Sequence, residues 1–363
     1  MAYKYKQQSQ LTRVLCTVAF VVFTFCYLLF YQADVMVVAQ HIASGGQTHY
    51  VPWVGALLIT LVLKLLQVGV NMIFALYRRT HALTYLPSML VLAFITDISP
   101  NVHGRIELGA WLWVLPLVLV LFVLVALLAR RYQLLEPDER ISGISSQLNW
   151  INLSTLFIMM VGVGMIGNGN RVFHYRAAME HKMRSGDFAG ALRVGAESDE
   201  TDGSLTMLRA FSLSRERQLP ERLFCYSLAP GSRNLVPDGK EVYALMLVPQ
   251  SVIVKTARRN RHYQLCGLLM DKKLQSFAKA LNLYYAPDSV LPTHYREAMA
   301  LYAHTTNNPV RLCKDSAMMA EYRHFLAERS KAGDSPARQR QLKSHYGKTY
   351  WYYYHHDHSQ SRK

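Results

Sequence analysis

Residues 150–170, with the sequence WINLSTLFIMMVGVGMIGNGN, divide this chain into two parts of different character. Before Gly169 the chain consists mainly of long apolar runs that short polar turns interrupt. After Gly169 the chain is polar and basic and almost without apolar stretches. The sequence therefore predicts an all-α fold, in which a polytopic transmembrane helix bundle at residues 1–170 carries one water-exposed domain.

Apolar runs of membrane-spanning length recur along the first part, and we expect about five spans. They cover Leu11–Tyr31, Trp53–Tyr77, Leu83–Thr96, Trp111–Leu128 and Trp150–Ile166. The third is short and contains a proline, which membrane helices tolerate when neighbouring groups satisfy the freed carbonyl. The fifth ends in a GxGxxG sequence at residues 162–167. No strand precedes these glycines, so we assign them to close packing between helices and predict no cofactor.

The Lys and Arg residues that flank the spans predict an orientation. Lys4, Lys6 and Arg13 lie at or before the first span, whereas the loop at 32–52 has neither Lys nor Arg. Arg pairs follow the second and fourth spans. Cationic loops stay in the cytoplasm. We therefore expect a multi-pass membrane protein, in contact with membrane lipid, whose soluble domain lies on the outer face.

Two charged residues lie inside apolar runs and are candidates for an intramembrane polar site. Lys64 is in the second span and Asp97 follows the third. If these spans form an antiparallel hairpin, both side chains reach a similar depth and an ion pair is expected. The alternative is that Lys64 extends its ammonium toward the interface and Asp97 begins the outer loop.

The charge of the second part favours anionic partners. From residue 132 onward the chain holds 31 Lys and Arg against 21 Asp and Glu. This excess indicates either an anionic partner or a well-solvated surface. Scattered basic residues without a nucleic-acid-binding motif argue against nucleic acid. The five cysteines form no CxxC or zinc-type spacing, so we expect most of them to be small buried hydrophobic residues.

A helical rhythm in residues 171–330 predicts an α-solenoid-like domain. The sequence GDFAGAL, which begins at Gly186, resembles the turn between the two helices of a tetratricopeptide repeat. In this resemblance Gly186 ends one helix, Phe188 wedges between the helices, and Ala191 allows close approach. A second, degenerate copy places Phe277 and Ala280 in the same roles. Generic helical hairpins are the alternative.

Two segments interrupt or follow this rhythm. Residues 228–258 are rich in proline and glycine, and we expect an irregular linker there. Residues 331–363 read as a basic linker and a tail. The tail contains an aromatic cluster: Tyr350, Trp351, Tyr352, Tyr353 and Tyr354. Such a cluster either caps the last helices of the repeat or lies at the membrane interface.

Three histidines follow the aromatic cluster and are weak candidates for metal ligands: His355, His356 and His358. Adjacent histidines on a chain point in different directions, and no second cluster of ligands supports them. We therefore predict no metal site.

Three stretches carry a further resemblance: Leu219–Phe224, Leu291–Ala298 and Thr349–Tyr354. On these stretches the chain resembles an uncharacterised family of Bacteroidota polytopic inner-membrane proteins with a tetratricopeptide-like C-terminal domain. The resemblance implies an inner-membrane location, and the orientation expected from the Lys and Arg residues then places the soluble domain in the periplasm. It implies no known reaction.

These patterns lead to one main functional hypothesis. We expect a membrane-anchored interaction or scaffold protein whose helical repeat binds a protein or peptide. The alternative is a component of a polytopic membrane enzyme or transporter that handles envelope lipid or glycan, with Lys64, Asp97, His103 and Glu107 as its polar site. No catalytic constellation is evident and the spans hold few polar residues, so the sequence favours a non-enzymatic role.

Overall fold

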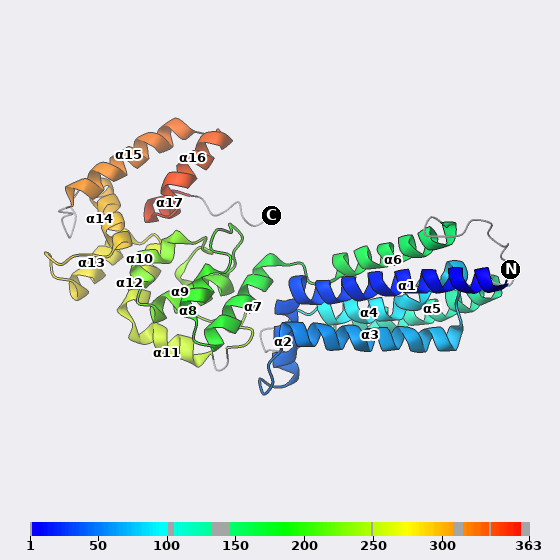
Figure 1. Ribbon diagram of the computed structural model, residues 1–363. Coiled ribbons are helices and arrows are strands. Elements are labelled where there is room, and N and C mark those ends of the chain that lie inside the picture. Colours follow the sequence, from blue (N-terminus) through cyan, green and yellow to red (C-terminus); the bar gives the residue numbers. More distant parts are fainter. Residues whose placement is uncertain are drawn as a thin grey trace. The chain divides into compact units, whose positions relative to one another are not determined.

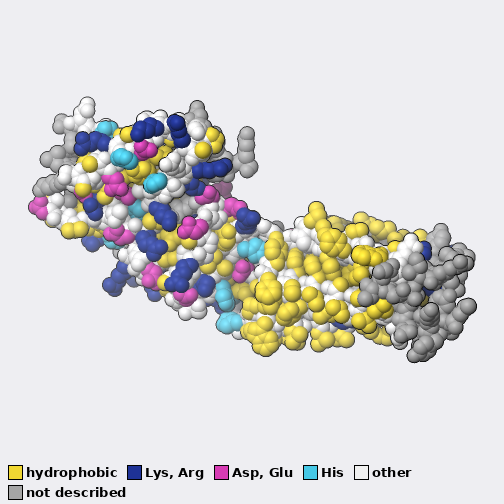
Figure 2. Space-filling view, turned by 45° about the horizontal axis from the view of Figure 1, so that its top comes forward, with side chains coloured by type: hydrophobic (Ala, Val, Ile, Leu, Met, Phe, Trp, Pro, Cys, Tyr) yellow, Lys and Arg dark blue, Asp and Glu magenta, His cyan; other side chains and the backbone are white. Residues whose placement is uncertain are grey.

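The computed structural model describes residues 2–100, 105–106, 108–132, 146–247, 250–307, 315–333 and 335–356. In these residues the regular structure is helical, and the chain divides into two compact units, Met1–Asn170 and Arg171–Lys363. The side chains on the visible faces differ: hydrophobic residues cover much of the N-terminal unit, whereas charged residues of both signs are scattered over the C-terminal unit (Figure 2).

The N-terminal unit is a bundle of long helices that run side by side (Figure 1). Its elements are α1 (Ala2–Cys26), η1 (Tyr27–Tyr31), α2 (Ala33–Ala43), α3 (Pro52–Phe74), η2 (Arg78–Tyr85), α4 (Leu86–Thr96), α5 (Trp111–Tyr132) and α6 (Gln147–Ile166). Within the described residues, four stretches are long and apolar enough to cross a membrane: Gln10–Tyr31, Pro52–Phe74, Trp111–Arg131 and Gln147–Ile166. The expected count of about five is corrected to four by this measure.

The third expected span is not among these four stretches because its helix is short. Helix α4 has 11 residues, about 16 Å, against an apolar membrane core of about 30 Å. The 3-10 segment η2 precedes it and extends the same path. Asn152 Nδ2 donates to the Arg78 carbonyl at 2.7 Å, and Asn168 N donates to the Thr96 carbonyl at 2.9 Å. Residues 78–96 therefore run parallel to α6 over roughly 24 Å.

Helices α1 and α6 are parallel. Thr12 Oγ1 donates to Asn149 Oδ1 at 2.6 Å, and Tyr27 OH donates to the Val163 carbonyl at 3.3 Å. Both contacts advance along the two helices in the same direction. The C-terminal end of α6 therefore lies at the end of the bundle opposite to the beginning of α1.

The C-terminal unit contains short helices joined by tight turns (Figure 1). They are α7 (Arg171–Arg184), α8 (Phe188–Arg193), α9 (Gly203–Arg215), α10 (Leu219–Arg222), η4 (Leu223–Cys225), η5 (Ser232–Leu235), α11 (Ser251–Arg259), α12 (Arg261–Met270), α13 (Leu274–Tyr284), α14 (Thr293–Thr305), α15 (Ser316–Ala332), α16 (Pro336–Tyr346) and α17 (Tyr350–His355). Asp202 and Asp315 cap α9 and α15 by accepting bonds from Leu205 N and Met318 N.

Two expected irregular segments contain helices. Helix α11 begins at Ser251, inside the linker expected at 228–258, and buries Ile253. The part of that linker before α11 is held by Glu180 of α7. The fully buried Glu180 carboxylate accepts bonds from Leu245 N, Met246 N and Leu247 N at 2.7, 2.5 and 3.0 Å. Helix α16 likewise replaces the expected basic linker.

Candidate functional site

The structure gives Lys64 polar neighbours inside the N-terminal bundle. Its ammonium donates to Gln67 Oε1 at 2.6 Å, to Thr17 Oγ1 at 2.9 Å and to Tyr85 OH at 3.4 Å. The ammonium also lies 5.2 Å from the centre of the Tyr85 ring. The charge therefore rests among neutral oxygen acceptors and an aromatic face.

Asp97 lies elsewhere, and the structure does not bring it to Lys64. It follows the last residue of α4 and accepts a bond from Trp111 Nε1 at 2.8 Å. The register of the hairpin explains the difference: Ser88 Oγ donates to the Leu63 carbonyl, so Ser88 lies at the level of Lys64. Asp97 is nine residues further along, roughly 13 Å away along the axis. The expected depth was wrong because the chain turns before Leu83: Gln67 Nε2 donates to Thr84 Oγ1, so η2 already lies beside α3.

The other polar residues of the alternative hypothesis, His103 and Glu107, lie outside the described residues. Asp97 is exposed near the end of the bundle and Lys64 is half-buried within it. The two described members of that polar site therefore do not form one site.

The turn at Gly186 has the geometry of a helix-ending motif. Gly186 has a φ of 81°, its N–H bonds to the Met183 carbonyl, and Asp187 N bonds to the Lys182 carbonyl. Helix α8 starts one residue later and buries Ala191. Phe188 packs edge-on to Phe211, with ring centres 6.1 Å apart. Helix α8 has only six residues, shorter than the sequence rhythm predicts.

The same turn occurs two more times in this unit. Lys272 (φ 58°) between α12 and α13 and Arg217 (φ 57°) between α9 and α10 take the place of Gly186. Their N–H groups and those of the next residues make the same pair of backbone bonds. Phe277 and Ala280 of α13 are buried, as the second repeat-like copy requires. The glycine that the second copy lacks is replaced by a lysine in the left-handed conformation.

The aromatic tail forms helix α17 and lies in the core of the C-terminal unit. Tyr350 and Trp351 have no exposed surface, and Tyr353 is 5% exposed. Trp351 Nε1 donates to the Glu297 carbonyl at 2.7 Å. The hydroxyls of Tyr350 and Tyr353 donate to the Leu269 and Met270 carbonyls. The tail therefore packs on α12 and α14.

The remaining tail residues lie at the edge of this core. Tyr352 stacks on His356 with ring centres 4.6 Å apart, and Tyr354 packs on the core. His355 is 3.0 Å from Tyr322 OH and 3.1 Å from Arg329, and burial lowers its pKa to about 4. His358 lies outside the described residues.

A cysteine, a histidine and a glutamate meet beside this tail. Cys225 Sγ lies 3.9 Å from His294 Nε2, and His294 Nδ1 lies 2.9 Å from Glu297 Oε2. His294 and Glu297 are buried, and Cys225 is partly exposed. Burial opposes a charged imidazole, but the bonds to Cys225 and Glu297 outweigh it and raise the pKa of His294 to about 9.

Sequence reasoning missed this group. The spacing of three residues from His294 to Glu297 places both on one helical face, and that was visible in the sequence. The third member comes from η4, 69 residues earlier, and only the fold brings it there.

A basic surface surrounds helix α16, which buries none of its own residues. Between α15 and α16 lies a cavity of about 480 Å³, which we call the α15–α16 pocket. It is lined by His324, Glu328, Lys331, Ala332, Arg338, Gln341, Leu342, His345 and Tyr346. Residues 315–357 together hold seven Lys and Arg against two Glu and three Asp.

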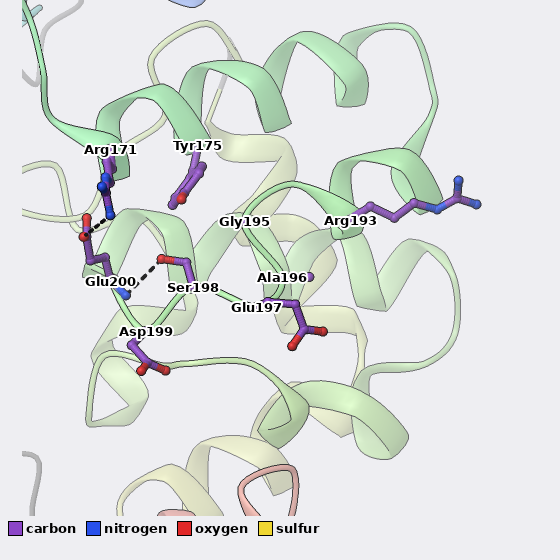
Figure 3. A pocket seen from close by; sticks show the side chains of 9 residues that line it. All are labelled: Arg171, Tyr175, Arg193, Gly195, Ala196, Glu197, Ser198, Asp199 and Glu200. Carbon is purple, nitrogen blue, oxygen red and sulfur yellow. Dashed lines mark hydrogen bonds and ion pairs between the residues drawn. The ribbon is translucent and has the colours of Figure 1, made fainter. Parts of the chain in front are cut away.

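A larger and shallower cavity of about 620 Å³ lies beside the start of α7 (Figure 3). Arg171 and Glu200 face each other across one side at 3.2 Å, and the loop at 195–200 forms the floor. Asp199 and Glu197 of this loop pair with Lys343 and Lys348 at 2.5 and 3.8 Å. The acidic loop thus places carboxylates against the basic surface.

Comparison with known proteins covers the second half of the C-terminal unit. Residues 252–357 match a family of unknown function (DUF6057). The match runs from α11 to the end of α17 and includes His294, Glu297 and Trp351 but not Cys225. Two of the three stretches quoted from the sequence, 291–298 and 349–354, fall inside it. No curated protein matches the chain. No solved structure matches it.

Proposed function

We propose that the protein is a membrane-anchored binding protein whose C-terminal unit holds an acidic segment of a protein partner in the α15–α16 pocket. The N-terminal bundle is the anchor in this proposal. Its long helices leave large apolar side chains exposed, for example Leu61 of α3 and Leu117 of α5. Lipid tails can cover such surfaces, whereas water cannot without cost.

The Lys and Arg distribution and the parallel course of α1 and α6 support the orientation in this proposal. With the N-terminus in the cytoplasm, the bundle delivers Asn170 to the outer face. In a Bacteroidota inner membrane, as the sequence resemblance implies, this face is periplasmic. An alkaline phosphatase fused after Gly169 should then be active. A fusion that is inactive after Gly169, together with a second fusion that is active in the loop at 32–52, would count against this orientation.

The observation that carries the proposed function is the charge of the α15–α16 surface. Lys331 of α15 and Arg338 of α16 line the pocket, and Lys343 lies further along α16. A contact within the chain supports a carboxylate as the ligand, because Lys343 binds the Asp199 carboxylate. An acidic peptide offers several carboxylates at once, which makes such contacts cooperative.

A lipid surface fits these helices less well. Helices that bind membrane surfaces expose large apolar side chains beside their cations. Among the described residues, neither α15 nor α16 exposes one. The turns at Gly186, Arg217 and Lys272 give the unit a succession of helical pairs, as in tetratricopeptide-like proteins, which bind peptides on such arrays.

A direct binding measurement tests this function. A labelled oligoglutamate peptide is titrated with the full-length protein in mild detergent, and its fluorescence anisotropy is followed. The double variant Lys331→Glu/Arg338→Glu should weaken binding about tenfold or more. The matched control is Arg258→Glu/Arg259→Glu on α11, which changes the net charge equally at another exposed place. It should leave the affinity within about twofold.

Two results would contradict the proposal. Equal weakening by both double variants would mean that net charge alone attracts the peptide. Binding of anionic vesicles through the same two residues, without binding of the peptide, would assign the surface to lipid. The proposal would be supported if, in native membranes, a protein partner stays bound to the α11 variant and is lost from the pocket variant.

The alternative is a membrane enzyme or transporter for envelope lipid or glycan. Of its two described charged residues, Lys64 and Asp97, Lys64 alone lies in the interior of the bundle. That hypothesis depended on Lys64 and Asp97 acting together. Their different levels leave it without a shared polar site, and we do not favour it.

A further inference from the structure

The sulfur of Cys225 lies at the end of a fixed chain of polar groups. The His294 ring is held on one side by Glu297 and against one edge of Phe224, whose ring centre is 5.2 Å away. The Glu297 carboxylate is itself held by Tyr350 N, which donates to Oε2 at 2.7 Å. These contacts direct His294 Nε2 at Cys225 Sγ. Cys225, His294 and Glu297 therefore lie in the sequence nucleophile, acid–base partner and group that orients this partner.

The charge state of His294 makes this arrangement reactive. A protonated imidazole next to sulfur stabilises a thiolate and thereby speeds its attack on electrophiles. The Lys348 carbonyl lies 3.7 Å from the sulfur and accepts a bond from the uncharged thiol.

The position of the Lys348 carbonyl limits the chemistry. Attack on an ester or amide creates an oxyanion, which needs N–H donors next to the sulfur. The neighbour here is a carbonyl oxygen, which repels an oxyanion. Attack on a disulfide creates no oxyanion, because the electron pair departs on the leaving sulfur. The geometry therefore suits a disulfide better than an acyl group.

We propose that Cys225 is a reactive thiol that forms a mixed disulfide with a small disulfide molecule, with His294 as its acid–base partner and Glu297 as the residue that positions His294. In this step the Cys225 thiolate attacks one sulfur of the disulfide. A new S–S bond forms while the old one breaks. The second sulfur leaves as a thiolate and takes a proton from His294 or from water.

The adduct would sit beside the turn that joins α16 to α17. Lys348 belongs to that turn, and α17 carries the buried Trp351. A group attached to Cys225 thus presses on the connection between the basic helix and the helix that fills the core. The modification is expected to loosen α16, the helix on which the proposed function relies.

The test measures the reaction of each cysteine with oxidised glutathione in the full-length protein by mass spectrometry of the cysteine peptides. An introduced cysteine, Ser344→Cys on exposed α16, serves as an ordinary thiol in the same molecule. Its rate should rise about a hundredfold from about pH 6 to about pH 8, as the thiolate fraction grows. The rate at Cys225 should exceed that of the control about tenfold at the lower pH and rise less steeply than that of the control.

The variants assign the roles. His294→Gln should restore the steep pH profile at Cys225, and Glu297→Gln should give an intermediate profile. If the His294→Gln variant does not fold, Glu297→Gln still tests the roles, because its amide oxygen can accept the bond from Tyr350 N. A Cys225 rate in the unaltered protein that rises as steeply as that of the control overturns the proposal. A flat profile that survives both substitutions overturns the roles of His294 and Glu297.

Discussion

Gly186 and Arg217 occupy the same place in two turns of the C-terminal unit. Each has a left-handed backbone and lies one residue before the N-cap residue of the next helix. Each also ends its own helix with the same pair of backbone bonds. A glycine adopts this conformation without strain, whereas a residue with a Cβ pays a conformational cost of about 1 kcal/mol.

This equivalence predicts opposite effects of substitution at the two turns. Gly186→Ala should destabilise the unit by about 1 kcal/mol, and Arg217→Gly should stabilise it by up to about 1 kcal/mol. Arg217→Gln is the matched control, because it removes the same charge from an exposed position and keeps the Cβ. Hydrogen exchange of peptides from residues 171–247 in the full-length protein measures the change. If Arg217→Gly and Arg217→Gln behave alike, backbone strain is not the cause.

The carboxylate of Glu180 should be essential for the segment that precedes α11. Glu180→Ala leaves three buried N–H groups without their acceptor and should cost about 3 kcal/mol or more. Glu180→Gln retains one acceptor oxygen and should cost less. Limited proteolysis should then cut the alanine variant within residues 240–247 first. Equal resistance of both variants and the original protein would show that the segment is held by other contacts.

The imidazolium of His294 predicts how stability depends on pH. Its pKa in the folded protein, about 9, lies above the ordinary value of 6.5. A raised pKa of a base stabilises the fold fully below the ordinary value and loses this contribution as pH rises through the folded value. The melting temperature of the C-terminal unit should therefore fall between about pH 6.5 and about pH 9. In the His294→Gln variant this part of the decline should vanish, and an unchanged decline would exclude His294 as its source.

Lys64 and Asp97 should act independently. Lys64 contacts Thr17, Gln67 and Tyr85, and Asp97 contacts Trp111, so no bond joins the two. The effects of Lys64→Met and Asp97→Asn on thermal stability in detergent should add within about 0.5 kcal/mol in the double variant. A larger coupling energy would require the two groups to meet in a conformation that differs from this one.

Trp351 and Tyr352 are neighbours with different surroundings, and they test the role of the tail. Trp351→Ala removes a fully buried ring and should cost about 3–5 kcal/mol. Tyr352→Ala removes a half-buried ring that stacks on His356 and should cost about 1 kcal/mol or less. Calorimetry of the full-length variants separates the two values. Similar costs would mean that α17 contributes through its backbone and not through its indole.

The sequence predicted the class of fold because hydrophobic periodicity and run length are local properties. The helical character of both halves and the apolar helices of the first half depend only on such patterns. The turn at Gly186 was also visible, since a glycine followed by an N-cap aspartate is a local sequence feature. Its equivalent at Lys272 was read as degenerate, because a left-handed lysine leaves no trace in the sequence.

The candidate sites depended on long-range register and were harder to predict. The level of Asp97 relative to Lys64 is set by where the chain turns between α3 and η2, and no charge pattern encodes this position. Cys225 meets His294 only because η4 packs beside α14. Helix α16 was read as a linker because its apolar face is nearly absent, and its helical state comes from neighbours in the fold.

The position of Trp351 after α12 and α14 in the sequence has a consequence for biosynthesis. The ribosome makes α12 and α14 before α17, yet α17 fills the centre of the core that these two helices surround. Until α17 has been made, the nascent unit exposes that core. A chain that is cut or stalled before α17 therefore carries an open hydrophobic site that quality-control proteases and chaperones can bind.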